Sequence, residues 1–391
     1  MNNWKKMRLG DVCTIERGGS PRPINDYITQ EEDGINWIKI GDTKPNSMYI
    51  TETKEKIRPS GVKKSRRVYK GDFLLSNSMS FGRPYILAID GCIHDGWLVI
   101  RDENECFDKK FLYFYLGSPN VYAEFTRLAV GGVVNNLNST LIKNLIVVIP
   151  SIAEQRNIAA TLDKICETIA DRKRQLEQLD LLVKSRFVEM FGDVESNSKK
   201  WNEELLSRHL RVVGGYAFRS EGFSERGIPV LRIGNINSGY FKPVNLVFWQ
   251  YEASLDRYLL YPGDLVISLT GTVGKDDYAN VCILGNEYEM YYLNQRNAKL
   301  ELESTVTNEY LANVLKIPRI KSRLTGISRG VRQANVSNRD ILNLVIPIPP
   351  LPLQEKFADF VRQVDKSKLE IQQGLEKLEL QYNALMQRYF G

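Results

Sequence analysis

The chain has 391 residues, of which 43% are hydrophobic and 26% are charged, and these proportions are ordinary for a soluble globular protein of two or three domains. Its 53 Lys and Arg residues exceed its 47 Asp and Glu residues by 6, a weakly basic balance that permits a polyanionic partner without requiring one. The five cysteines include no Cys-x-x-Cys pair, the first residues are polar, and no long apolar run occurs. A zinc ribbon, a disulfide framework, a signal peptide and a membrane span are therefore not expected, and we expect a cytoplasmic protein.

Residues 1–150 are predicted to form a mixed, strand-rich domain. Short apolar runs bounded by turn residues are typical of strands. The runs in this domain are Ile35–Ile40, Phe73–Ser76, Leu98–Arg101 and Leu145–Ile149. The segment Phe111–Leu116, which runs up to Pro119, is predicted to be a short helix.

A long helix is predicted to follow within residues 151–192. Ser151 and Glu154 have the spacing of a capping box at its start, and Gly192 is placed to end it. A helix over 154–191 would be ~57 Å long at ~1.5 Å per residue. Apolar residues recur at every seventh position, which is the pattern of a helix that packs on another helix. These positions are Leu162, Ile169, Leu176 and Val183. The small, polar segment 193–200 is the predicted linker.

The second half repeats this organisation, with a second strand-rich domain over 201–349 and a second helix over 350–391. Corresponding pairs of segments are Trp37–Asp42 with Val230–Asn235, Lys70–Ser76 with Pro262–Ser268, and Gly18-Gly19 with Gly214-Gly215. From Gly131, which corresponds to Gly330, the offset stays at 199 residues to the end of the chain. The apolar seam of the second helix comprises Val364, Ile371, Leu378 and Leu385. The two units therefore correspond closely in their C-terminal part, which is the helix and the segment before it, and differ in their N-terminal part.

No catalytic or metal-binding constellation is recognisable in the sequence. His94 and His209 occupy non-equivalent places in the two units, so a histidine-based triad or metal centre is not expected. The segment ending in Gly274-Lys275 lacks the first glycine of a phosphate loop. Glu52-x-Lys54 fits the end of a nuclease motif, but the second unit lacks it. We expect no catalytic residue, no metal ligand and no bound cofactor in this chain.

The order of these segments, present twice, resembles the specificity subunit of type I restriction-modification systems. The resemblance implies an α+β fold with two target-recognition domains, each followed by a long spacer helix. It also implies that the helices pack as an antiparallel coiled coil with pseudo-twofold symmetry. The implied partners are double-stranded DNA, methyltransferase subunits that methylate adenine, and restriction or translocase subunits. S-adenosylmethionine, ATP and Mg would then be bound by those partners. The implied DNA target is split into two half-sites. Because the N-terminal parts of the two units differ in sequence, we expect this target to be asymmetric.

Candidate DNA-binding residues lie at strand ends, beside glycines and in one basic run. Phosphate contacts position a protein on DNA, whereas contacts with base edges specify the sequence. Arg suits guanine, and Asn or Gln suits adenine, in the major groove. The candidates are Lys63, Lys64, Arg66, Arg67, Asn77, Arg83, Arg127 and Asn136 in the first unit, and Lys275, Arg329, Arg332 and Gln333 in the second.

Two other interpretations remain open. The chain could act alone as an enzyme, in which case a change such as Glu52→Ala would abolish nuclease or methyl-transfer activity. It could also be an assembly scaffold that does not discriminate DNA sequences. For the apolar seams of the two helices, the simplest hypothesis is that they pack on each other, so that partner subunits bind the outer faces.

Overall fold

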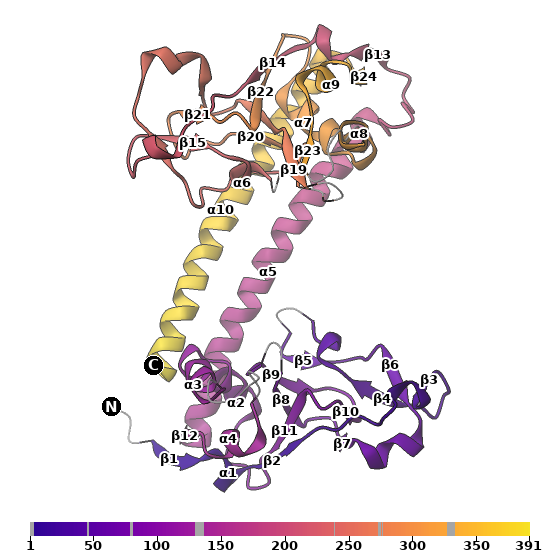
Figure 1. Ribbon diagram of the computed structural model, residues 1–391, viewed down its shortest axis with the longest axis vertical. Coiled ribbons are helices and arrows are strands. Elements are labelled where there is room, and N and C mark those ends of the chain that lie inside the picture. Colours follow the sequence, from indigo (N-terminus) through magenta and orange to yellow (C-terminus); the bar gives the residue numbers. More distant parts are fainter. Residues whose placement is uncertain are drawn as a thin grey trace. The chain divides into compact units, whose positions relative to one another are not determined.

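A computed structural model describes residues 4–44, 47–78, 81–129, 137–237, 239–272, 275, 277–326 and 333–391. The chain divides into two compact units, one formed by residues up to Lys173 together with Gln373–Gly391, and the other by Arg174–Gln372. Each unit contains one strand-rich module, here called module 1 (residues 4–150) and module 2 (residues 201–349), and parts of both long helices (Figure 1). The predicted α+β class is confirmed.

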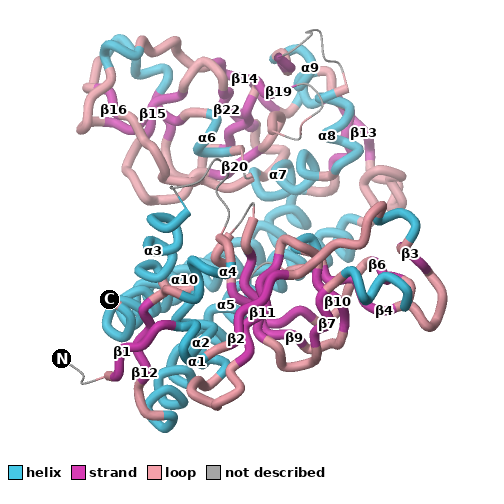
Figure 2. The backbone as a smooth tube through the Cα atoms, turned by 60° about the horizontal axis from the view of Figure 1, so that its bottom comes forward, coloured by secondary structure: helices cyan, strands magenta, loops and turns pink. Residues whose placement is uncertain are grey.

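Module 1 is built on two five-stranded sheets. The first, the central sheet, has the order β2 (Thr14–Arg17), β11 (Trp97–Arg101), β8 (Phe73–Ser76), β9 (Pro84–Leu87) and β5 (Tyr49–Ile50). The second has the order β3 (Ile28–Thr29), β6 (Glu55–Ile57), β4 (Ile35–Ile38), β10 (Gly91–Ile93) and β7 (Arg66–Val68). The short strands β1 (Lys5–Arg8) and β12 (Ile146–Ile149) pair with each other. Figure 2 shows these strands among short helices and loops.

Module 2 repeats this plan with four strands in each of its two larger sheets. Its central sheet has the order β14 (Leu210–Gly214), β22 (Asn297–Leu302), β18 (Leu265–Ser268) and β20 (Val281–Ile283). The other has the order β16 (Phe248–Trp249), β15 (Ile228–Leu231), β21 (Tyr291–Leu293) and β17 (Leu259–Leu260). Two pairs of strands complete it, β13 (Asn202–Leu205) with β24 (Val345–Ile348), and β19 (Thr270–Thr272) with β23 (Gln333–Asn335).

Short helices cover the sheets of both modules. They are α1 (Leu9–Val12), α2 (Lys109–Leu116), α3 (Pro119–Ala129), α4 (Ser139–Lys143), α6 (Ile233–Ile236), α7 (Asn308–Lys316), α8 (Pro318–Thr325) and α9 (Asn338–Leu342). The helix predicted at Phe111–Leu116 lies within α2, and α7 is its counterpart in module 2. Pro119 and Pro318 each begin a further helix, because proline lacks an N–H that the first helical turn would leave unpaired in any case.

The two modules match in strand pairing more closely than in sequence. In module 1, β11 pairs antiparallel with β2 and β8, and in module 2, β22 pairs antiparallel with β14 and β18. The structure corrects the predicted glycine correspondence by one residue. A Cβ atom would lie 2.2 Å from the His94 carbonyl oxygen at Gly18 and 2.2 Å from the Asn294 carbonyl oxygen at Gly215. The backbone therefore approaches a carbonyl where only glycine fits, and Gly18 corresponds to Gly215.

The long helices α5 (Ile152–Phe191) and α10 (Leu351–Phe390) have 40 residues each. In the first unit, the start of α5 lies beside the end of α10, with Lys173 Nζ 2.9 Å from Glu379 Oε1. In the second unit, the end of α5 lies beside the start of α10, with Lys368 Nζ 2.7 Å from Asp180 Oδ1. Within each unit the two helical segments are therefore antiparallel.

The predicted seam residues differ in burial along these helices. Three of them are buried in the core of a module, and the other five are half-buried, among them Leu385, which packs against the core of module 1. The buried set is Leu162, Val183 and Val364, and the half-buried set is Ile169, Leu176, Ile371, Leu378 and Leu385. The reason is geometric, because a helix pair covers only one stripe of each helix, whereas a module covers additional faces.

One buried glutamine at the start of each long helix joins the helix to its module. Gln155 Nε2 donates to the carbonyl oxygens of Cys106 (2.9 Å) and Pro150 (3.0 Å), and its Oε1 accepts the N–H of Asp108 (2.8 Å). Gln354, 199 positions later, makes the same three kinds of hydrogen bond with Thr305, Pro349 and Thr307. Both glutamines are fully buried. Each glutamine thereby connects the segment before its long helix with the start of α2 or α7 in the same module.

The other end of each long helix packs on the module in the same unit. Phe390 lies 5.6 Å, between ring centroids, from both Phe111 and Tyr115. Phe191 lies 4.8 Å from Tyr310, the residue that corresponds to Phe111. Gly192 has a φ of +77°, which ends α5 as predicted. No helix in the described ranges is both long enough and apolar enough to cross a membrane.

The segment predicted as a linker, 193–200, is folded against the end of α5. Lys199 Nζ donates to the carbonyl oxygens of Glu189 (2.8 Å) and Met190 (3.0 Å), which lie in the last turn of the helix. At the start of α5, Ser151 Oγ accepts the N–H of Glu154 (3.3 Å), but the Glu154 carboxylate accepts the indole N–H of Trp4 (3.2 Å). The predicted capping box is thus only half formed.

Candidate nucleic-acid interface

One end of the central sheet in module 1 gathers three loops. The strands β2 and β8 end there, and β11, which is antiparallel to both, begins there. The loops 18–22, 77–83 and 94–96 therefore emerge together. Two backbone hydrogen bonds connect them, from Gly18 N–H to Trp97 O (2.9 Å) and from Asn77 N–H to Gly96 O (2.9 Å). We call the described residues of these loops the loop edge of module 1.

Module 2 has an equivalent loop edge, formed by the described residues of loops 215–219, 269–280 and 294–296. The Leu269 N–H donates to Arg296 O (2.8 Å), and the Gln295 N–H donates to Tyr216 O (2.8 Å). Loop ends at one edge of a rigid sheet are common positions for binding residues. Each module therefore presents one loop edge on the same strand framework.

Two predicted residues of module 1, Asn77 and Arg83, lie on its loop edge and differ in accessibility. Arg83 is exposed, and its N–H donates to Ser76 Oγ (2.9 Å) at the end of β8. Asn77 is 2% exposed, and its Nδ2 donates to Asp95 O (3.1 Å). The expectation of a DNA contact needs correction for Asn77, because a side chain enclosed by its own module supports the loop from inside.

The basic run Lys63–Arg67 flanks the same loop edge, on the turn before β7 and on β7 itself. A Cβ atom at Gly19 would lie 3.1 Å from Lys64 O, so the run passes directly beside the loop. Lys63 and Lys64 are exposed, and Lys64 Nζ donates to Tyr27 Oη (2.6 Å). Arg66 is 2.9 Å from Glu16 Oε1. Arg67 lies 5.9 Å from the Tyr69 ring centroid. Most of the basic side chains in this run therefore already contact another residue of module 1.

Arg127 lies on α3, which supports the loop 77–83 through the stacked rings of Phe81 and Tyr122 (5.8 Å). Arg127 is exposed and forms an ion pair with Glu124 (2.8 Å). Exposed ion pairs contribute little to stability, so a phosphate can replace the carboxylate at small cost. The predicted residue Asn136 lies outside the described residues.

In module 2, β19 and β23 form a two-stranded antiparallel ribbon at the loop edge. Gly271 is opposite Ala334, and this face is closed, because Ala334 is buried and a Cβ atom at Gly271 would lie 2.7 Å from Tyr278 Cβ. The opposite face carries Thr270, Thr272 and Asn335, of which the last two are exposed. A two-stranded ribbon is one of the elements that the major groove of DNA admits.

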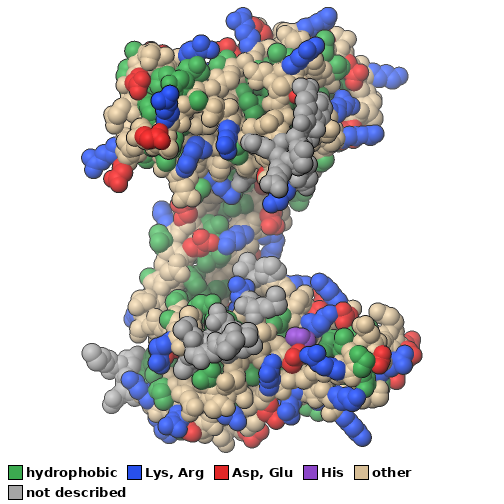
Figure 3. All heavy atoms as spheres, viewed as in Figure 1, with side chains coloured by type: hydrophobic (Ala, Val, Ile, Leu, Met, Phe, Trp, Pro, Cys, Tyr) green, Lys and Arg blue, Asp and Glu red, His purple; other side chains and the backbone are tan. Residues whose placement is uncertain are grey.

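The ribbon brings two of the predicted residues of module 2 together. Lys275 is exposed and its N–H donates to Thr272 O (3.0 Å), while Gln333 is the backbone partner of Thr272. Arg329 and Arg332 lie outside the described residues. Lysine and arginine side chains are interspersed with acidic ones on the visible face of both modules (Figure 3), so charge alone does not mark the interface.

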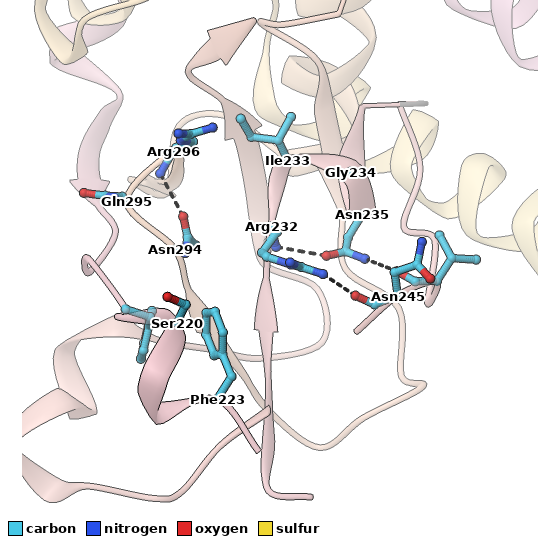
Figure 4. Close-up of a pocket in the computed structure, with 12 residues that line it drawn as sticks. Ser220, Phe223, Arg232, Ile233, Gly234, Asn235, Asn245, Asn294, Gln295 and Arg296 are labelled. Carbon is cyan, nitrogen blue, oxygen red and sulfur yellow. Dashed lines mark hydrogen bonds between the residues drawn. The ribbon is translucent and has the colours of Figure 1, made fainter. Parts of the chain in front are cut away.

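A cavity of about 560 Å³ lies beside the loop edge of module 2 (Figure 4). Phe218 and Phe223 contribute apolar surface, and Asn294, Gln295 and Arg296 form one rim. The other lining residues include Arg232, Asn235 and Asn245. The buried Asn235 accepts the Arg232 N–H at Oδ1 (2.9 Å), and the Arg232 guanidinium donates to the Asn245 carbonyl oxygen.

Sequence reasoning missed the triplet Asn294-Gln295-Arg296. A signal was present, because three residue types that bind purine edges follow one another between the apolar strand β21 and the strand β22. The matching triplet in module 1 is His94-Asp95-Gly96, since both triplets lie between equivalent strand pairings.

The His94-Asp95 pair is chemically different from its counterpart. Asp95 Oδ1 accepts the Ser20 hydroxyl (2.6 Å) and lies 3.2 Å from His94 Nε2. Burial lowers the pKa of His94, opposed by the Asp95 charge. For Asp95, burial raises the pKa, but the hydrogen bond from Ser20 and the charge of His94 outweigh it and lower the pKa overall. At neutral pH this turn therefore carries a negative charge.

The described residues include no group of three or more His, Cys, Asp or Glu that could hold a metal ion. The cysteines are unpaired, and burial raises the pKa of Cys13 to about 12 and that of Cys166 to about 11. Such thiols are not reactive thiolates at neutral pH. The chemistry of both loop edges is that of hydrogen bonding and charge.

The family model for the "Type I restriction modification DNA specificity domain" matches the chain twice, over residues 1–181 and 209–380. The chain belongs to this family. It is a type I specificity subunit that recognises a DNA target, and family membership confirms that it is a DNA-recognition subunit and not an enzyme. Two matches in tandem also confirm the internal repeat.

Relatives and solved structures extend over nearly the whole chain. The specificity subunit of the MjaVIII enzyme of Methanocaldococcus jannaschii is 22% identical, over 96% of this chain and 91% of the relative. That of the EcoKI enzyme of Escherichia coli K12 is 24% identical, over 93% and 82%. The S subunit structure from M. genitalium has a TM-score of 0.60 at 17% identity, and covers 100% of this chain and 98% of its own. A chain from a study of type I complex assembly has a TM-score of 0.55 at 17% identity, over 99% and 97%.

Proposed function

We propose that each module of this specificity subunit binds one half of a split, asymmetric DNA target through its loop edge. The observation that carries the proposal is that the two loop edges share a strand framework and differ in chemistry. Module 2 presents the polar ribbon β19–β23 and the Asn294–Arg296 turn. Module 1 presents Arg83 and an anionic His94-Asp95 turn. Different side chains on one framework favour different half-sites.

The long helices are proposed to set the spacing between the half-sites and to bind methyltransferase subunits that methylate adenine. A helix of 40 residues is ~60 Å long at ~1.5 Å per residue, which is comparable to roughly 18 base pairs of DNA. Exposed apolar side chains on the helices, which include Leu181 (60%), Val188 (57%) and Leu380 (70%), support a protein partner. Restriction or translocase subunits are the further proposed partners.

The proposed partner subunits supply the chemistry that this chain does not. S-adenosylmethionine would be bound by the methyltransferase subunits, and ATP and Mg by the restriction or translocase subunits. A solved relative comes from a study of type I complex assembly, which supports the existence of such partners. The free cysteines fit a reducing compartment, and we place the complex in the cytoplasm.

The test is to co-express the chain with its methyltransferase subunits and to map methylated adenines along the host DNA. The expected motif consists of two unlike half-sites separated by unspecified bases. Replacing residues 201–349 with the recognition domain of another specificity subunit is expected to change one half-site and to preserve the other. A continuous motif, or a motif unchanged by the exchange, contradicts the proposal and favours the scaffold interpretation.

A further inference from the structure

We propose that Arg296 specifies a G·C base pair in the half-site bound by module 2, with Gln295 contacting a neighbouring base pair. The inference rests on the proposed function, in that the loop edge of module 2 must bind DNA. An arginine guanidinium donates two parallel hydrogen bonds to O6 and N7 of guanine, and a glutamine amide bonds N6 and N7 of adenine. Both side chains rise from one turn between β21 and β22 (Figure 4).

The backbone of this turn is fixed by hydrogen bonds at each residue. The Arg296 N–H donates to Asn294 Oδ1 (3.3 Å), and the Arg296 carbonyl oxygen accepts the Leu269 N–H (2.8 Å). The Gln295 N–H donates to Tyr216 O (2.8 Å), and the Asn297 N–H donates to Asn294 O (2.9 Å). A fixed backbone limits the directions that the side chains can take, and such preorganisation lowers the entropic cost of a specific contact.

The side chains themselves are available for a ligand. Gln295 and Arg296 are exposed, and within the described ranges neither side chain has a hydrogen bond, an ion pair or a ring contact. Other arginines of module 2 have partners of their own, such as Arg211 with Glu303 (3.5 Å) and Arg232 with the Asn245 carbonyl oxygen. No partner among the described residues therefore occupies the five guanidinium N–H donors of Arg296.

The position of Arg296 favours a base contact over a phosphate contact. Its carbonyl oxygen is bonded to Leu269, the residue directly before the ribbon strand β19. The ribbon carries Thr272 and Asn335 on its exposed face. If this ribbon enters the major groove, Arg296 at its foot enters the groove with it, where base edges are the available acceptors.

Module 1 lacks this device. The residue at the position of Arg296 is Gly96, which has no side chain, and the residue at the position of Gln295 is Asp95, whose carboxylate accepts the Ser20 hydroxyl (2.6 Å). The two modules therefore differ at the two positions whose side chains in module 2 are exposed and available to a ligand. A G·C requirement carried by Arg296 is therefore specific to one half-site.

The test uses the full chain co-purified with its methyltransferase subunits, and a DNA library randomised in the half-site of module 2. Arg296→Ala is expected to abolish the preference at one G·C pair, with discrimination falling roughly ten- to a hundredfold, and to leave the half-site of module 1 unchanged. Arg296→Lys is expected to be intermediate, since lysine keeps the charge and loses the paired geometry. The matched control is Arg211→Ala, an exposed, ion-paired arginine on β14, which should change no preference.

The outcomes separate this inference from the function on which it rests. If Arg296→Ala weakens binding to all sequences equally, the guanidinium contacts a phosphate and the inference is wrong, while the proposed function stands. If the wild-type complex shows no preference in the second half-site, the proposed function itself fails. A change of preference at an A·T pair would likewise overturn the assignment to guanine. The Arg296 side chain is exposed and has no partner within the part of the chain that the structure describes, so the thermal unfolding of both variants should match that of the wild type.

Discussion

Modules 1 and 2 are two versions of one framework that differ where a ligand would bind. The shared parts are buried and fixed by backbone geometry, as Gln155 and Gln354 show at the helix starts and Gly18 and Gly215 show at the loop edges. The parts that differ are exposed side chains on the loops, such as Arg296 in place of Gly96. A repeat of this kind can change its ligand on one side without disturbing the other, because framework and ligand contact are carried by different residues.

The largest expected effect comes from removing the buried glutamines, and it should be similar in both modules. Gln155→Ala removes the partner of the buried Pro150 carbonyl oxygen, and of the partly buried Asp108 N–H and Cys106 carbonyl oxygen. At ~1–3 kcal/mol for each unsatisfied group, we expect a loss of about 4 kcal/mol in the free energy of unfolding. Denaturant unfolding of Gln155→Ala and Gln354→Ala measures both, and the exposed Gln373→Ala on α10 is the control. A loss in only one module would show that the two junctions are not equivalent.

The next largest effect on stability is expected at the glycines of the loop edges whose backbone passes close to a carbonyl oxygen. Gly18→Ala would place a Cβ atom 2.2 Å from His94 O, whereas Gly41→Ala in the same module meets nothing within 4 Å. The first substitution must displace the turn 94–96 and is expected to cost about 2–3 kcal/mol, while the second should be nearly neutral. Gly215→Ala is the matched change in module 2. Equal thermal stability of Gly18→Ala and Gly41→Ala would contradict the close approach.

Lys275 provides a comparison with Arg296 within module 2, because we expect it to contact a phosphate, which positions the protein on DNA, and not a base, which specifies the sequence. The side chain is exposed beside the ribbon, and a lysine that contacts phosphate contributes affinity and no sequence preference. We expect Lys275→Ala to weaken DNA binding of the assembled complex several-fold on all sequences. The dependence of binding on salt should also fall, by roughly one unit in the slope of log K against log salt. An altered base preference would instead make Lys275 a specifying residue.

Local patterns predicted the framework well, because they depend on neighbouring residues. The apolar runs located β8 at Phe73–Ser76 without error and β11 to within one residue, and the helix predicted over 154–191 is α5, Ile152–Phe191. The backbone hydrogen bonds that fix the turn at Arg296, and the burial of Asn77, were not predictable, because they depend on loops that meet only after the sheet has formed. A polar residue at a strand end has the same local pattern whether it faces solvent or its own module.

The smallest effect concerns pH and follows from the charge difference between the two turns. The pKa of His94 is lowered mainly by burial, and the pKa of Asp95 is lowered by Ser20 and His94 against the effect of burial. The folded protein therefore binds protons at both groups less readily than the unfolded chain. The stability associated with His94 is lost as the pH falls below 6.5, the ordinary pKa of histidine, and that associated with Asp95 is lost as the pH falls below 3.8, the ordinary pKa of aspartate. Arg17 and Arg22 also lower the pKa of His94.

Module 2 has Asn294 and Gln295 at these positions and no titrating group there. The double variant His94→Asn, Asp95→Gln gives module 1 the uncharged turn of module 2. Its unfolding is expected to depend less on acid than that of the wild type, with a difference below about 1 kcal/mol because the groups are partly exposed. Trp37, whose ring lies 6.1 Å from that of His94, provides a fluorescence signal for the transition between pH 7.5 and 5. If the two proteins lose stability in parallel over that range, His94 does not carry the difference between the modules.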